Sequence, residues 1–310
     1  MKPKLFCGRS NPEFGKDVAK YLDMDLGKMT IEPFSDGELW IRFDENIRGV
    51  DVFIIQSTNP PDTNMIELLL MLDAAKRASA RRVTAVVPYY GYARQDRKDQ
   101  PRVPISAKLF ADLLQTAGAD RVVSMDLHSS QIQGYFNIPF DHLYSKKVLV
   151  GAIQNLGLDN MVVLAPDIGS VPMSRSYAKL LNASLAIIDK RRPAHNKAEV
   201  MHLIGKVGAK NVLIMDDMVD TAGTMVAAAK KARAMGAQSV NAAVTHGVLS
   251  GPAIRRLKKA PIDRILITDT IHIDSKKHMD KLIPVSVAPV FGEAIQRIHN
   301  EESISVLFDI

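Results

Sequence analysis

The sequence predicts an α/β protein of two related domains, each a mostly parallel sheet flanked by helices. Short apolar runs of strand length alternate with longer helical stretches along all 310 residues. This alternation is typical of parallel sheets, because each strand needs a crossover before the next can pair in parallel. A chain of this length holds one large domain or two of ordinary size.

The first half of the chain shows this alternation, with one exception near its start. Residues 39–43 alternate apolar and polar side chains as a half-buried strand does, and a turn containing Gly37 precedes them. The helix beginning at Met65 carries Ile66, Leu69 and Leu70 at amphipathic spacing. The predicted strands of this half are residues 5–7, 39–43, 52–55, 83–87 and 122–125, and the predicted helices are residues 11–22, 65–78 and 105–117.

The second half repeats the rhythm and contains a faint internal repeat. Gly118 is followed ten residues later by His128, and Gly236 is followed ten residues later by His246. The recurrence predicts two related domains, residues 1–145 and 146–310, with the last ~20 residues packing back on the first. The predicted strands are residues 161–164, 185–188, 212–215, 240–244 and 265–267, and the predicted helices are residues 171–181 and 225–235.

Composition narrows the class of protein. Hydrophobic residues make up 46% and charged residues 24%, which is ordinary for a globular protein with a sizeable core. The net charge is +6, but the basic residues are dispersed, which favours an enzyme that handles phosphates over a nucleic-acid binder. The single Cys7 excludes an internal disulfide and fits a reducing cytosol. With no signal peptide and no apolar run of roughly 18 residues, we expect a cytoplasmic protein without membrane contact.

Residues 212–224 contain the strongest local motif. An apolar run of strand length ends in three carboxylates, Asp216, Asp217 and Asp220, and a helix is predicted after the small residues that follow. Free backbone N–H groups at a helix start favour an anion, and small residues let a phosphate approach closely. The carboxylates suit sugar hydroxyls or a divalent cation, although an acidic strand end can also be plain capping.

The whole string resembles the ribose-5-phosphate loop of type I phosphoribosyltransferases and phosphoribosyl diphosphate (PRPP) synthetases. Five motifs occur in the order found in class I PRPP synthetases: residues 34–38, 92–98, 126–134, 190–193 and 216–224. The resemblance covers nearly the whole chain and implies a type I phosphoribosyltransferase-like fold. It implies transfer of the β,γ-diphosphoryl group of MgATP to the C1 hydroxyl of ribose 5-phosphate. The residues it assigns to ribose 5-phosphate are Arg192, Asp216, Asp217, Asp220, Thr221, Ala222, Gly223 and Thr224.

Two segments of the first half resemble the nucleotide-binding parts of that family. By pattern alone, residues 33–38 are equally well a structural hairpin, and the polar segment 89–104 is a solvated loop or a lid over a polyphosphate. The resemblance implies that Phe34 stacks on adenine while acidic residues reach its polar edge, often across a subunit boundary. The implied ATP-binding residues are Phe34, Asp36, Gly37, Glu38, Arg94, Gln95 and Asp96.

Other predicted roles concern a metal ion and catalytic cations. A lone histidine after a strand, such as His128, is more often structural, and the cations from Lys190 onward also fit a solvated turn or a nucleic-acid patch. The resemblance implies that His128 and Asp167 bind Mg²⁺ near ATP and that Lys190, Arg192 and Arg94 are catalytic. Position 170 is serine where the family's pattern leads us to expect glycine.

The C-terminal tail resembles the family's regulatory segment. The implied pocket for phosphate or ADP lies between subunits, and the resemblance implies a homo-oligomer, a hexamer in this family. Asn46 stands where we expect a serine. The residues assigned to this pocket are Arg48, Ser303, Ser305 and Phe308.

Three alternative functions differ in what they explain. A phosphoribosyltransferase that consumes PRPP accounts for residues 216–224 but not for Phe34 or Lys190. A non-catalytic regulatory paralogue of the synthetase would be expected to lose the catalytic cations or to carry a long insertion in the lid. A nucleic-acid binder accounts for the charge and for none of the motifs.

Overall fold

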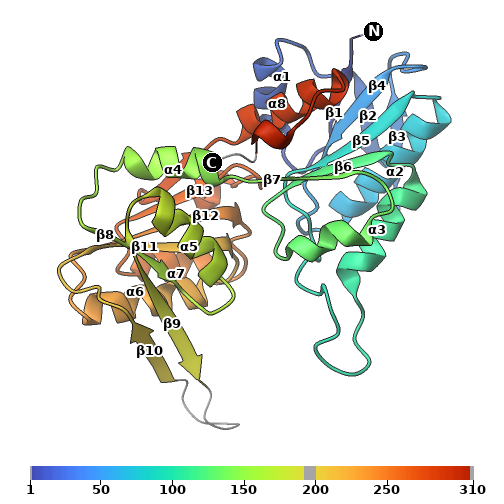
Figure 1. The fold of residues 1–310 in the computed structure, drawn as a ribbon. Helices are drawn as coiled ribbons and strands as arrows, with labels where there is room; N and C mark the ends of the chain where they lie inside the picture. The colour runs from blue at the N-terminus through green and yellow to red at the C-terminus, as the bar shows by residue number, and fades with distance from the viewer. Residues whose placement is uncertain (1, 192–199, 308–310) are drawn as a thin grey trace. The chain divides into compact units, whose positions relative to one another are not determined.

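The computed structural model describes residues 2–191 and 200–307, with residues 190, 191, 200 and 201 placed only by their backbone. The chain forms two compact units (Figure 1). Unit 1 comprises residues 1–144, 270–272 and 287–310, and unit 2 comprises residues 145–269 and 273–286. Segments from both ends of the chain therefore belong to unit 1.

Unit 1 is built on a five-stranded sheet in which all neighbouring strands are parallel. The central strands are buried on both faces, as apolar runs without alternation require. The sheet order is β1 (Lys4–Cys7), β4 (Asp51–Ile55), β5 (Arg82–Val87), β6 (Arg121–Met125) and β7 (Phe140–Leu143).

Helices cover both faces of this sheet (Figure 1). On one face, α2 (Thr63–Arg77) and α3 (Ser106–Ala117) form a hydrophobic core with β4, β5 and β6. On the other face, α1 (Pro12–Tyr21) packs on α8 (Ala288–His299), with the Phe14 and Phe291 rings 5.4 Å apart. A separate antiparallel hairpin consists of β2 (Met29–Pro33) and β3 (Leu39–Phe43).

Unit 2 is built on a seven-stranded sheet that is parallel except where β10 joins β9. The chain places β9 and β10 on one side of β8 and later places β12 to β14 on the other side of β11. The order reverses between β8 and β11, which is where open α/β sheets bind ligands. The sheet order is β10 (Val200–Ile204), β9 (Ser184–Arg191), β8 (Met161–Ala165), β11 (Asn211–Val219), β12 (Ser239–Gly247), β13 (Arg264–Thr268) and β14 (Leu282–Val285).

Helices also cover both faces of the second sheet. On one face, α6 (Gly223–Ala234) and α7 (Ala253–Lys259) pack on alternate residues of β8, β11 and β12. On the other, α4 (Lys146–Gln154) and α5 (Val171–Leu180) pack on the residues between them. The remaining elements are three short 3₁₀ helices, η1 (Ser130–Tyr135), η2 (Ser275–Lys277) and η3 (Ser305–Leu307).

The predicted fold class is confirmed, since both sheets are mostly parallel and both are flanked by helices. Every predicted strand and helix is present, with ends that differ by a few residues. The sequence patterns missed β7, β10 and β14 and the helices α4, α7 and α8, and they gave no bounds for β2, the first strand of the expected hairpin. None of the described helices has the length and apolar character needed to cross a membrane.

Candidate functional site

The carboxylates of the strongest motif lie at the end of β11, but Asp216 and Asp217 are part of the strand rather than beyond it. Pairing with β12 continues to Val219, opposite Gly247, and extends the strand past the predicted end. Burial, and next the adjacent Asp217 and the Asp167 carboxylate, raise the pKa of Asp216 to about 8. The carboxyl groups are therefore crowded at the end of this strand, and the crowding and burial disfavour the charged form of Asp216.

The turn after β11 is held by contacts with two neighbouring segments. The Ser250 hydroxyl donates to Asp220 Oδ1, and Ser250 N donates to Asp220 O at 3.1 Å. Arg256 Nη1 donates to Thr221 O at 3.0 Å. Ala222 has a left-handed backbone, φ 60°, and α6 begins at the next residue, Gly223. The turn therefore delivers the free N–H groups of a helix start beside the carboxylates, as a sugar phosphate requires.

Asp167 lies on the strand next to β11. β8 and β11 pair in parallel as far as Leu164 and Ile214, so their carboxyl ends lie side by side. Ser170 N donates to Asp167 Oδ1 at 3.1 Å, and Ser170 Oγ donates to Asp167 O at 3.0 Å. The serine at position 170 therefore stabilises this turn. The point where the strand order reverses holds Asp167, Asp216 and Asp217.

The predicted catalytic cations lie at the edge of the described chain. Lys190 is in β9, paired with Met201 of β10. The antiparallel hairpin of β9 and β10 extends the sheet beyond the predicted strand of residues 185–188. Arg192 lies outside the described residues.

In unit 1, two predicted motifs meet. Residues 92–98 connect β5 to α3, and Asp96 Oδ2 accepts a hydrogen bond from Gln131 Nε2 at 2.6 Å, while the Tyr135 hydroxyl donates to Asp96 O. Gln131 and Tyr135 belong to η1, within and just after the motif of residues 126–134. Gln95 Oε1 accepts from Ser106 Oγ at 2.6 Å, and the Arg94 side chain is exposed. The segment predicted to be a lid is thus anchored at Gln95 and Asp96.

His128 follows β6 in the same region and is exposed rather than buried. Asp126, two residues earlier, is buried and has φ 37°, a conformation that non-glycine residues adopt rarely and often near functional sites. Leu127 N donates to His142 Nε2 at 2.9 Å, which fixes the loop that presents His128. The buried histidine of this pair is His142, which the sequence patterns did not single out.

Phe34 lies at the tip of the hairpin formed by β2 and β3, with 54% of its surface exposed. Phe34 N donates to Glu38 O at 2.7 Å, and Glu38 N donates to Asp36 Oδ1 at 3.0 Å. Gly37 has φ 96°, which a residue with a side chain rarely adopts. The turn is therefore rigid and presents an uncovered aromatic ring to a ligand or a partner.

The residues predicted to form a regulatory pocket belong to unit 1. Arg48 N donates to Asn46 Oδ1 at 3.0 Å. The hydroxyls of Ser303 and Ser305 lie 2.8 Å apart, and Arg297 Nη1 donates to Ser303 O at 3.3 Å. Phe308 lies outside the described residues.

The predicted metal ligands are His128 in unit 1 and Asp167 in unit 2. Within residues 2–191 and 200–307, no three His, Cys, Asp or Glu side chains are grouped so that they could hold a metal ion. Sequence reasoning also missed Ser250, which bonds Asp220. Its signal is the small-residue turn Ser250-Gly251-Pro252 after β12, which resembles the other strand-end turns of the site.

Comparison with known proteins identifies the family. Residues 3–118 match the model of the N-terminal domain of ribose phosphate pyrophosphokinase, and residues 192–309 match the phosphoribosyl synthetase-associated domain. The ribose-phosphate pyrophosphokinase of Chlorobaculum tepidum is 54% identical over 307 residues, covering 99% of this chain and 95% of the relative. The enzyme of that name from Caldanaerobacter subterraneus is 54% identical, covering 98% and 97%.

A solved structure agrees over the whole molecule. The phosphoribosylpyrophosphate synthetase of Mycobacterium smegmatis is 42% identical to this chain and covers 97% of it, with 100% of that structure matched and a TM-score of 0.93. The similarity thus includes the order and connection of the elements as well as the motifs. The resemblance found in the sequence is confirmed, and the chain belongs to the ribose-phosphate pyrophosphokinase family.

Proposed function

We propose that this protein is a ribose-phosphate diphosphokinase, which converts MgATP and ribose 5-phosphate into PRPP and AMP. The C1 oxygen of the sugar attacks the β-phosphorus of ATP, the bond from that phosphorus to the α,β-bridging oxygen breaks, and AMP leaves with that oxygen. The C1 hydroxyl releases its proton. The observation that carries the proposal is full-length identity of about one half to enzymes of that name, together with the acidic turn at the point of strand reversal in unit 2.

The acceptor sugar binds in unit 2. The free N–H groups at the start of α6 receive the 5-phosphate, and the adjacent side chains hold the phosphate and the ribose hydroxyls. Lys190 and Arg192 supply positive charge beside them. The binding residues are Arg192, Asp216, Asp217, Asp220, Thr221, Ala222, Gly223 and Thr224.

The nucleotide binds residues of unit 1. The exposed ring of Phe34 stacks on adenine, with Asp36, Gly37 and Glu38 at the polar edge of the base. Arg94, Gln95 and Asp96 contact the polyphosphate, and Arg94 stabilises negative charge on the transferring group. Gln95 and Asp96 form hydrogen bonds with α3 and η1, and these bonds fix the position of the backbone at the neighbouring Arg94.

Mg²⁺ is the proposed cofactor, with His128 and Asp167 as its protein ligands. Mg²⁺ in nucleotide sites takes only one or two protein ligands and completes its coordination with water and substrate phosphates. Burial and then the neighbouring carboxylates raise the pKa of Asp216, and those carboxylates also favour a cation nearby. When bound, Mg²⁺ neutralises charge on the diphosphoryl group.

A direct assay decides between this reaction and its alternatives. Purified protein is incubated with ATP, ribose 5-phosphate and Mg²⁺, and AMP and PRPP are measured. We expect both products in equal amounts, and no turnover once EDTA has removed the metal. A protein that yields neither, or that consumes PRPP with a free base instead, contradicts the proposal.

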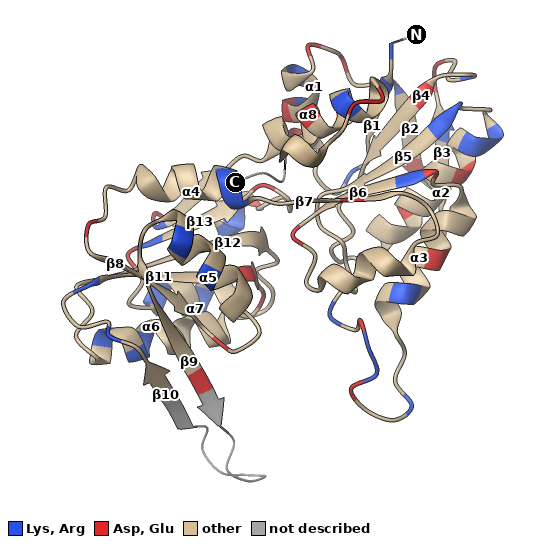
Figure 2. Cartoon of the chain, in the orientation of Figure 1, with Lys and Arg blue, Asp and Glu red and all other residues tan. Residues whose placement is uncertain are grey.

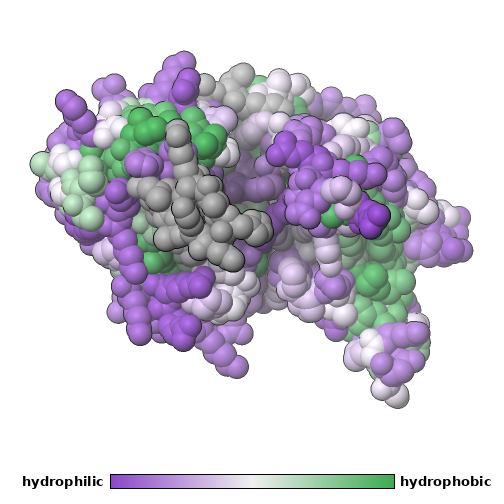
Figure 3. Space-filling model, turned by 90° about the horizontal axis from the view of Figure 1, so that it is seen from below, coloured by the Kyte–Doolittle hydropathy of each residue, from purple (hydrophilic) through white to green (hydrophobic). Residues whose placement is uncertain are grey.

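Exposed apolar side chains on unit 1 point to an oligomeric assembly. The exposed apolar side chains of unit 1 favour a partner subunit; they are Phe34, Ile66, Leu70, Leu109 and Leu113. Figure 3 shows that the face of the molecule seen from below carries hydrophobic surface, drawn in green. We expect a cytoplasmic hexamer of the 34.1 kDa chain. Light scattering measures the mass of the assembly.

Regulation is the second property to test. Adding phosphate or ADP to the AMP assay tests activation and inhibition through Arg48, Ser303, Ser305 and Phe308.

A further inference from the structure

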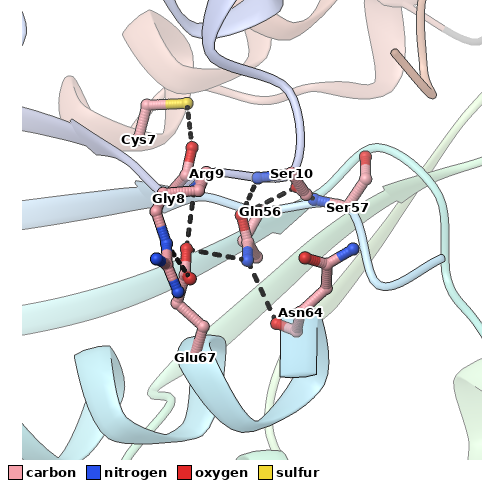
Figure 4. Close-up of polar contacts among 8 residues, drawn as sticks. All are labelled: Cys7, Gly8, Arg9, Ser10, Gln56, Ser57, Asn64 and Glu67. Carbon is pink, nitrogen blue, oxygen red and sulfur yellow. Dashed lines mark hydrogen bonds and ion pairs between the residues drawn. The ribbon is translucent and has the colours of Figure 1, made fainter. Parts of the chain in front are cut away.

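A buried acid that the reaction does not use lies in the second turn of α2. Glu67 is 1% exposed, on the face of the helix that otherwise carries Met65, Leu68 and Met71. A buried carboxylate is costly unless it is paired and hydrogen-bonded. Its Oε1 accepts from Arg9 N at 2.6 Å and from Gln56 Nε2 at 3.1 Å, and its Oε2 accepts from Arg9 Nε at 2.7 Å (Figure 4).

Gln56, the residue after β4, connects Glu67 to the loop that contains Ser10. Its Oε1 accepts from Ser10 N at 3.1 Å and from Ser10 Oγ at 2.7 Å, and its Nε2 donates to Asn64 O at 3.1 Å as well as to Glu67. The side-chain amide therefore has one orientation, because a reversed amide would place its NH₂ against the Ser10 N–H. A Cβ on Gly8 would lie 2.4 Å from Gln56 Oε1, so the backbone of the β1 end closes over this network.

The two residues after Gln56 anchor the first residues of the lid. Ser57 N donates to Ser10 Oγ at 2.9 Å, and Tyr89 N donates to Ser57 Oγ at 3.4 Å. Thr58 Oγ1 accepts from Gly91 N at 2.7 Å, and a Cβ on Gly91 would lie 2.2 Å from Thr58 O. Hydrogen bonds thus run without a break from Glu67 through Gln56 and Ser10 to the residues that precede Tyr92.

The last link joins α2 itself to the lid. The Tyr92 hydroxyl donates to Asp62 Oδ1 at 2.6 Å, and Asp62 immediately precedes the helix that carries Glu67. Ala93 is buried in the core under α2 and α3, whereas Arg94 beside it is exposed. The backbone that leads into Arg94 is therefore fixed on one side by the core and on the other by the Glu67 network.

We propose that Glu67 is a positioning residue for diphosphoryl transfer. Through Gln56, Ser57 and Thr58 it fixes the first residues of the lid, so that Arg94 meets the polyphosphate. The proposal rests on the proposed function. Glu67 contacts neither substrate nor reacting atoms. Its effect comes from placement, because a displacement of about 1 Å in a catalytic group can cost about 100-fold in rate.

Glu67→Gln tests the proposal without making a cavity, because the two side chains have nearly the same shape. A glutamine oxygen can replace only one carboxylate oxygen, so its NH₂ must face Arg9 or Gln56 donors. In the AMP assay we expect kcat/KM for ATP to fall about 10- to 100-fold while the KM for ribose 5-phosphate stays at the wild-type value. Thr58→Val, which removes the hydroxyl bonded to Gly91, is expected to shift the same constant in the same direction.

Two controls separate positioning from loss of stability or charge. Leu72→Ala removes core volume from the same helix but no hydrogen bond of the network, and Glu13→Gln removes an exposed carboxylate that pairs with Lys16. We expect Leu72→Ala to lower the melting temperature without the selective loss for ATP. Glu13→Gln is expected to match the wild type in both measurements.

A second measurement does not depend on activity. Under native conditions, trypsin is expected to cleave after Arg94, Arg97 and Lys98 faster in Glu67→Gln than in the wild type or in Leu72→Ala. A wild-type protein that releases no AMP contradicts the proposed function, while the trypsin comparison still decides on positioning. Wild-type kinetics for ATP together with a wild-type cleavage rate in both Glu67→Gln and Thr58→Val would overturn the role of Glu67.

Discussion

The two units place their candidate site residues by different means. In unit 2, Asp167, Asp216 and Asp217 come from the ends of neighbouring central strands, and the turn proposed to bind the phosphate begins a core helix. In unit 1, Phe34 lies at the tip of a hairpin and Arg94 lies on an exposed connection between β5 and α3. The proposed sugar-phosphate site is thus part of the sheet, whereas the residues proposed to bind the nucleotide are on projecting segments that the scaffold must anchor.

The two units also differ in the charges that their helices carry (Figure 2). On unit 2, α6 carries Lys230, Lys231 and Arg233 and α7 carries four cations, with no acid on either helix. Lys231 and Arg233 lie in the last turn of α6, far from the acidic turn where this helix begins. Arg256 of α7 is the cation that reaches this turn, by donating to Thr221 O at 3.0 Å. On unit 1 the helices carry both signs, often paired, as in Lys108 with Asp112 and Arg77 with Asp73.

Lys190 gives the largest expected effect and tests whether unit 2 supplies catalytic charge in addition to a binding turn. Lys190→Ala should lower turnover by at least ~10³ while changing ribose 5-phosphate affinity little, because charge on the transferring group is then left uncompensated. Steady-state kinetics and a binding titration measure the two. Lys210→Ala is the matched control, since Lys210 bonds Ser184 at the opposite end of β9. Turnover near wild type in Lys190→Ala would remove the lysine from the mechanism.

Gly223 tests whether a glycine of the acidic turn is needed for ligand binding rather than for folding. An added Cβ would lie 3.6 Å from Arg256 Nη1 and 3.8 Å from Thr221 Oγ1, which is ordinary contact, so Gly223→Ala should fold with wild-type stability. A phosphate on the N–H groups of the turn would meet that methyl group. We therefore expect the KM for ribose 5-phosphate to rise about 10- to 100-fold.

Gly205 supplies the contrast for that measurement. It has φ 113°, and its Cβ would lie 2.9 Å from Ala186 Cβ, so Gly205→Ala should lower the melting temperature and leave that KM unchanged. Thermal unfolding and kinetics on both variants test the pair. If Gly223→Ala leaves the KM at the wild-type value, the phosphate does not bind on this turn.

Phe34 gives the smallest expected effect and tests the role of the projecting hairpin of unit 1. Phe34→Ala should raise the KM for ATP about tenfold through lost stacking on the base. Trp40→Ala, an exposed aromatic on the same hairpin that packs with Arg42, should not.

Mixing variants extends this test to the partner subunit. If the site is shared, hybrids of Phe34→Ala and Lys190→Ala chains, assayed at an ATP concentration below the wild-type KM, should be more active than the average of the two separate variants. Some sites in such hybrids combine an intact Phe34 with an intact Lys190. Hybrids no more active than this average would place both residues of a site in one chain.

The turn chemistry was predictable because it depends on neighbouring residues. The string from Asp216 to Thr224 carries its carboxylates, small residues and helix start in one continuous stretch, and the structure places them together. The contact of Asp96 with Gln131 and Tyr135 was not predictable, because these residues are far apart in sequence and meet only through the neighbouring strands β5 and β6. Glu67 was overlooked because an acid on an amphipathic helix usually faces water.

The sequence by itself determined the alternation of strands and helices, the fold class and the family, since periodicity and motif order are local properties of the chain. Tertiary structure alone decided that β8 lies beside β11, that α8 packs on α1, and that Glu67 faces inward onto Arg9 and Gln56. Strand neighbours and buried polar pairs are settled by packing between distant segments. That packing fixes the acidic turn at the end of a sheet and leaves the residues proposed to bind the nucleotide on anchored projecting segments.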